Sequence, residues 1–141
     1  MRKVLTSLAI SVLLLPALAG SVSAQAVYTV EIQSATLLAK GAAVEVTFDM
    51  VCPTGVYAGF QATADVTQRV GGGKVASGSI GAYGANGAWT CDGVTPNHVI
   101  LNVKSTTGTA FKNGVALVTA AAKGMSATPY AQDVEEMRLQ K

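Results

Sequence analysis

The sequence predicts an all-β protein, an antiparallel β-sandwich of about seven to nine strands. Apolar and polar residues alternate with period two along several segments, as they do in half-buried strands. Turn-forming Gly, Asn and Asp residues separate these segments at the spacing that an all-β domain needs. The chain has two cysteines, which suits one bridge, and no helix of ordinary length is visible.

The first two predicted strands lie at residues 28–32 and 44–52. In the first, Tyr28, Val30 and Ile32 form an apolar face. The apolar face of the second consists of Val44, Val46, Phe48, Met50 and Cys52. Successive side chains of a strand point to opposite faces, so we expect Cys52 to point into the core with this set.

The third predicted strand, residues 60–69, has small side chains on its inner face, including Ala62 and Ala64. A neighbouring sheet or a large residue must therefore come close to it. Trp89 is the candidate for that space. It has the same parity as Cys91, so we expect its ring to pack over or beside the disulfide.

Three further strands are indicated by the pattern. Val99, Leu101 and Val103 form one face of a strand at residues 98–104. Residues 115–122 are apolar apart from Thr119, which favours a strand buried on both faces or a central strand. Residues 135–139 are expected to close the sheet, with a short C-terminal helix from Pro129 onward as the alternative.

Glycine-containing turns are predicted between these strands. They are Lys40-Gly41, Pro53-Thr54-Gly55, Gly71-Gly72-Gly73-Lys74, Asn86-Gly87, Asp92-Gly93, Thr107-Gly108 and Asn113-Gly114. The triple glycine with Lys74 is not expected to cradle a phosphate, because such loops lead into a helix and have Ser or Thr after the lysine. Val75 follows here, so a hairpin loop is expected.

Residues 1–24 are typical of an export signal that is cleaved. Arg2 and Lys3 precede an apolar run, and Val22-Ser23-Ala24 gives the small-x-small pattern of a cleavage site. The run is too short to span a membrane, so no membrane span is expected. Ser21 stands where a lipoprotein signal has cysteine, and the last residues form no sorting motif. We therefore expect a secreted or extracellular protein.

Cleavage leaves one domain, residues 25–141, with a net charge near zero. The chain has ten basic and eight acidic residues, and two of the basic ones lie in the signal. A neutral chain with scattered lysines gives no electrostatic reason to expect nucleic acid or an anionic membrane as a partner.

Cys52 and Cys91 are expected to form a disulfide, because both lie in the exported part. The bridge should stabilise the fold by about 3–4 kcal/mol in the chain-entropy model. A thiol nucleophile would have only His98 as a base, and two Cys with one His lack the paired spacing of zinc sites.

No catalytic residues, metal site or cofactor are expected. His98 is the single histidine, and we expect it to be a polar residue on the solvent face. Asp49, Asp65 and Asp92 lack the clustering of calcium ligands. The acidic residues from 133 to 136 are expected to be a solvated face, partly paired with Arg138 and Lys141.

Four aromatic residues near the turns around the two cysteines form a candidate binding patch. They are Tyr57, Phe60, Tyr83 and Trp89. Aromatic side chains at an open end of a sandwich serve in carbohydrate or protein recognition. The competing interpretation is that they belong to the core.

Three segments carry a resemblance to a family: Cys52-Pro53, residues 87–93 and residues 110–116. Here the chain resembles small secreted actinobacterial proteins of unknown function, each with a single immunoglobulin-like domain and one disulfide. The resemblance implies an immunoglobulin-like sandwich. True immunoglobulin domains have tyrosine two residues before the second cysteine, where Trp89 stands here, so the resemblance supplies no site residues.

These observations favour a secreted, non-catalytic extracellular or cell-envelope protein, structural or engaged in protein interaction. The alternative is a small secreted inhibitor or ligand-binding protein that uses the aromatic patch near the disulfide. An extracellular protein or an envelope glycan is the expected kind of partner.

Overall fold

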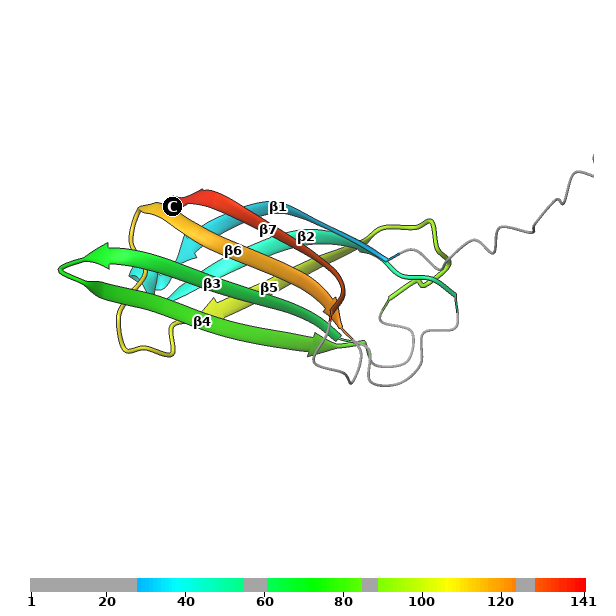
Figure 1. The fold of residues 1–141 in the computed structure, drawn as a ribbon, viewed down its shortest axis with the longest axis horizontal. Helices are drawn as coiled ribbons and strands as arrows, with labels where there is room; N and C mark the ends of the chain where they lie inside the picture. Colours follow the sequence, from blue (N-terminus) through cyan, green and yellow to red (C-terminus); the bar gives the residue numbers. More distant parts are fainter. Residues whose placement is uncertain (1–27, 55–60, 85–88, 124–128) are drawn as a thin grey trace, which may run out of the picture.

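The computed structural model describes residues 28–54, 61–84, 89–123 and 129–141, which form a sandwich of two antiparallel sheets (Figure 1). One sheet has the order β1-β2-β5 and the other β4-β3-β6-β7. The seven strands are β1 (Thr29–Leu38), β2 (Ala43–Val51), β3 (Gln61–Gly71), β4 (Lys74–Tyr83), β5 (Asn97–Lys104), β6 (Gly114–Lys123) and β7 (Pro129–Leu139). A short 3-10 turn, η1 (Ala39–Gly41), joins β1 to β2. The predicted all-β sandwich is confirmed, whereas its immunoglobulin-like subtype stays a prediction.

The period-two alternation of apolar and polar residues predicted β2, β3 and β5 correctly. In β2 the side chains of Val44, Val46, Phe48 and Met50 are fully buried, and so is Cys52 just after the strand. The intervening side chains of β2 are partly exposed on the other face. The same alternation is present in β5, where Val99, Leu101 and Val103 are buried.

The predictions for the two last strands are refined by the structure. β6 is central, between β3 and β7, but it is not buried on both faces throughout, because Val115 and Leu117 are exposed. The C-terminal segment is the strand β7, so the alternative of a helix from Pro129 is wrong. Its pairing with β6 along nearly its whole length explains why the strand starts earlier than expected.

Two segments differ from the prediction. β4 was not among the predicted strands, because its sequence of Ala, Ser and Gly shows little alternation, but it pairs with β3 along its length. Trp89 and Cys91 lie in a loop and not on a strand, so the parity argument for the Trp89 ring does not hold. The Trp89 side chain is half-buried against the core.

The core combines large side chains on one sheet with small ones on the other. The inner face of β1-β2-β5 carries bulky residues such as Phe48, Met50 and Leu101. The facing sheet contributes mainly alanine: Ala62, Ala64, Ala76, Ala116, Ala120 and Ala122. Large residues opposite small ones let the two faces interdigitate without voids. The described core is therefore filled chiefly from the β1-β2-β5 side.

The odd-numbered strands run in one direction and the even-numbered strands in the other, so the sandwich has two distinct ends. At one end β1, β3, β5 and β7 finish, and the 3-10 turn, the β3–β4 turn and the loop 105–113 lie there (Figure 1). We call it the hairpin end. The opposite end, where β2 finishes just before Cys52, is the disulfide end. A strand of ten residues separates them by about 33 Å.

The sheets are joined along both sides. On one side, Ile32 N–H donates to Asp133 Oδ2 (2.9 Å) and Leu37 N–H donates to the Gln140 carbonyl (3.0 Å), which link β1 to β7. On the other side β4 meets the end of β5 at Gly78. A Cβ on Gly78 would lie 2.0 Å from the Lys104 carbonyl oxygen. The close approach of β4 and β5 therefore requires glycine there.

We expect Gly78→Ala to lower the free energy of unfolding by roughly 1–3 kcal/mol, since the added methyl meets backbone that cannot move alone. Urea unfolding of the two proteins measures the difference. Gly81→Ala on the same strand is the matched control. Its methyl would meet the flexible end of Gln61 at 3.0 Å, so we expect a change within about 1 kcal/mol. Equal losses in the two variants would contradict the close-approach argument.

Candidate functional site

The disulfide end is held by the predicted bridge between Cys52 and Cys91, whose sulfur atoms are 2.02 Å apart. The bridge ties the end of β2 to the loop that precedes β5. Gly93 N–H also donates to the Cys52 carbonyl (3.0 Å), so backbone and side chain fix the loop at the same point. The disulfide is thus confirmed, with both cysteines outside the strands.

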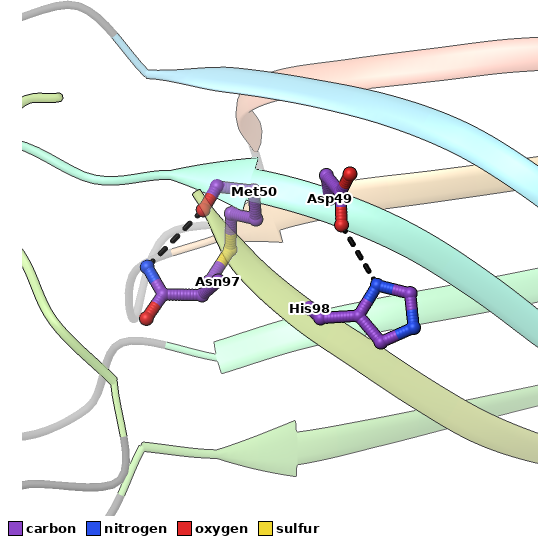
Figure 2. A network of polar contacts seen from close by, with 4 residues as sticks. All are labelled: Asp49, Met50, Asn97 and His98. Carbon is purple, nitrogen blue, oxygen red and sulfur yellow. Dashed lines mark hydrogen bonds and ion pairs between the residues drawn. The ribbon is translucent and has the colours of Figure 1, made fainter. Parts of the chain in front are cut away.

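Asn97 is the polar centre of this end, and no sequence pattern indicated its role. Its amide nitrogen donates to the carbonyls of Met50 (3.1 Å) and Thr90 (2.9 Å), and its Oδ1 accepts from Thr90 N–H (2.7 Å). Figure 2 shows the Asn97 amide directed at Met50 of the neighbouring strand. One side chain thereby satisfies both backbone groups of Thr90, which lies outside the strands, and bonds the Met50 carbonyl of β2.

Asp92 shapes the turn that follows the second cysteine. Its Oδ1 accepts from the backbone N–H of Val94 (2.9 Å) and Thr95 (2.7 Å), and its Oδ2 accepts from the Thr95 hydroxyl (2.6 Å). The Thr95 hydroxyl first, and then these N–H groups, lower the pKa of Asp92 from 3.8 to about 2. Both oxygens of the Asp92 carboxylate therefore accept hydrogen bonds within its own turn.

Of the predicted aromatic patch, the structure describes two members. Tyr83 ends β4 with 69% of its surface exposed. Trp89 is half-buried and covers Gly84, where a Cβ would lie 2.6 Å from the ring. The two residues therefore flank the same glycine. Tyr57 and Phe60 lie outside the described residues.

A second aromatic pair, which sequence reasoning missed, lies at the same end. The rings of Tyr28 and Tyr130 stack with centroids 4.7 Å apart. Burial, and next the neighbouring Tyr130, raise the pKa of Tyr28 above its usual 10.0. Tyr130 belongs to β7 and Tyr83 to β4, at opposite edges of one sheet. Three strand spacings, about 14 Å, separate these edges, so the tyrosines form two groups and not one patch.

His98 lies beside a carboxylate, and a histidine paired with a carboxylate can act as a general acid or base in catalysis. Its Nδ1 is 2.9 Å from Asp49 Oδ1, since the two residues are register partners on β5 and β2 (Figure 2). Both side chains are on the outer face of the sheet, with 60% of His98 and 37% of Asp49 exposed. The His98–Asp49 pair is therefore open to water on the surface of the sheet.

The described residues contain no group of three or more His, Cys, Asp or Glu side chains placed to hold a metal ion. Asp133 accepts from the Ile32 backbone and is used in joining the sheets. The turn Gly71–Gly73 connects β3 to β4, strand to strand, as expected for a hairpin and unlike a phosphate loop.

We expect replacement of both cysteines by serine to lower the free energy of unfolding by about 3–4 kcal/mol, because the unfolded chain then loses a closed loop. Urea unfolding of the oxidised protein and the Cys52→Ser/Cys91→Ser variant measures it. Reduced wild-type protein is the control and should match the variant. A loss below about 1 kcal/mol would contradict the expected contribution of the bridge.

We expect the Asp92 carboxyl to titrate at about pH 2 and Thr95→Val to raise that pKa toward 3.8. A folded-state pKa below the unfolded value stabilises the protein above about pH 4. This stabilisation is lost as the pH falls toward 2, and the variant should lose less of it. Side-chain NMR titration gives the pKa of Asp92. Thr119→Val is the control, because Thr119 lies in β6 and outside the Asp92 turn, so this variant should leave the pKa of Asp92 unchanged. Identical Asp92 titrations in the wild type and Thr95→Val would refute the role of the hydroxyl.

None of the described residues forms a helix long and apolar enough to cross a membrane. No model of a known protein family matches the sequence, and a search of curated proteins likewise finds no match.

Proposed function

We propose that this chain is a secreted, non-catalytic protein that acts through surface contacts, as a structural or protein-interaction module outside the cell or in its envelope. The observation that carries the proposal is the use of polar side chains at the disulfide end. Asn97 and Asp92 bond backbone groups of the loop, and Asp133 bonds the backbone of β1. These groups build a surface and leave no enclosed set of reacting side chains among the described residues.

Export is supported by the signal-like residues 1–24 together with the disulfide, which persists in oxidising compartments. An immunoglobulin-like sandwich is supported by the sheet orders β1-β2-β5 and β4-β3-β6-β7, in which the chain changes sheets after β2, after β4 and after β5.

The second candidate function is an inhibitor or ligand-binding protein that uses the aromatic side chains at the disulfide end. The strong exposure of Tyr83 beside Gly84 and Trp89 favours it. An exposed aromatic ring supplies large contact area at low conformational cost, which is typical of binding surfaces.

We expect cells that produce the protein to export it with Gln25 as the first residue and to retain it in the envelope without a covalent link. Intact mass determines the cleavage site, and extraction of the washed envelope with urea separates non-covalent from covalent retention. A product found only inside the cell with residues 1–24 intact would refute the proposal.

The Tyr83→Ala variant separates the two candidate functions. If the aromatic end binds a partner, most of the variant protein is no longer retained in the envelope, or it no longer binds most of the ligand that the wild type binds. If the protein is a structural module, the variant behaves as wild type. Ile100→Ala is the matched control, because Ile100 is an exposed apolar residue on the β1-β2-β5 face, away from the aromatic residues.

A further inference from the structure

Five basic side chains line hollows at the hairpin end. Arg69 lies near the end of β3, Lys74 begins β4, Lys40 is in the 3-10 turn, Lys112 precedes β6 and Lys141 follows β7. All five are exposed. We call these residues the basic patch. The lysines that look scattered in the sequence are gathered here because the strands alternate in direction.

The charges of the basic patch are not neutralised by acidic neighbours. All eight acidic residues lie in the part of the chain that the structure describes, where the one ion pair is His98–Asp49. Glu45 and Glu136 are the acidic residues nearest this end by register, and both lie on outer faces beside Lys104 and Arg138. The basic patch therefore presents a positive potential although the net charge of residues 25–141 is near zero.

Three neighbouring hollows lie in the basic patch. One of about 390 Å³ is lined by Arg69 and Lys74. A second, of about 570 Å³, lies between Lys74 and Lys112. A third, also of about 570 Å³, is lined by Lys112, Lys40 and Lys141. Adjacent hollows share a lysine, and no acidic residue lines any of the three.

Hydrogen bonds on its buried side hold the loop that carries Lys112 in place. The buried Gln68 donates through Nε2 to the Lys112 carbonyl and accepts the Lys112 N–H through Oε1, both at 2.8 Å. The next residue back, Phe111, is buried and donates its N–H to the Gly41 carbonyl (2.8 Å). The backbone of Lys112, the central lysine of the basic patch, is thus already ordered. Binding at Lys112 therefore costs less conformational entropy than binding at a mobile loop.

We propose that the basic patch binds a linear anionic polysaccharide along this line of hollows. Cations spaced along open hollows match anionic groups repeated along a polymer better than they match one small anion, which needs convergent donors. Among the described residues that line the hollows, Phe111 is the single aromatic one, and its buried ring is not available to stack on the bases of a single-stranded nucleic acid. A flat bilayer would span the hollows without filling them. That the polymer is extracellular rests on the proposed export.

Binding of the purified protein to dextran sulfate, with unmodified dextran as the uncharged control, tests the proposal. We expect binding to dextran sulfate alone, weakened about tenfold or more between 50 and 200 mM salt. Lys112→Gln should weaken binding roughly threefold and Lys74→Gln/Lys112→Gln roughly tenfold. Lys123→Gln, a lysine at the disulfide end of β6, should leave binding within about twofold. Thermal unfolding verifies that each variant is folded, and Lys74→Gln alone serves if the Lys112 variant is not.

No binding to dextran sulfate at 50 mM salt, or equal losses in the Lys112 and Lys123 variants, would overturn the proposal. So would equal or tighter binding to single-stranded DNA or to phosphatidylglycerol vesicles, because the occupant would then be a different class. These measurements use purified protein and are independent of export. An intact signal in cells would refute the proposed function while leaving the binding result standing.

Discussion

The packing of a bulky sheet face onto an alanine-rich one is the constraint on which the rest of the structure depends. Phe48 and Met50 of β2 fill space that Ala62 and Ala120 leave open on the facing sheet. Because interiors are packed at crystal-like density, the sheets can approach only where one face is small. The approach brings Gly78 against the carbonyl of Lys104 and lets the strands at both sides join. The positions of both ends follow from this contact.

The two ends use their polar residues differently. At the disulfide end, Asn97 and Asp92 are engaged with the backbone, so the exposed features that remain are aromatic rings such as Tyr83. At the hairpin end, Gln68 fixes the backbone of Lys112 and leaves the ammonium group free to face solvent. A ligand that depends on charge and one that depends on rings would therefore meet different ends of the molecule.

Local pattern was sufficient to predict β2, β3 and β5, because half-buried strands show period two in their own residues. It was insufficient for β4, whose identity depends on pairing with β3 and on a glycine required by another strand. The disulfide was predictable because two cysteines allow one pairing. The contacts of Asn97, the stacking of Tyr28 on Tyr130 and the basic patch were not, since each joins residues distant in the sequence. Net charge in particular conceals where charges lie.

The joining of β1 to β7 also bears on how the chain folds. Ile32 and Asp133, which bond each other across the side of the sandwich, are 101 positions apart in the sequence. The β1-β2-β5 sheet likewise cannot be completed until β5 is synthesised, which happens after β3 and β4. Pairings of this range are slow to form, and all-β sandwiches fold in about milliseconds to seconds. A chain interrupted before β7 would lack the partner that covers the β1 side, so the first strand to be made is among the last to be secured.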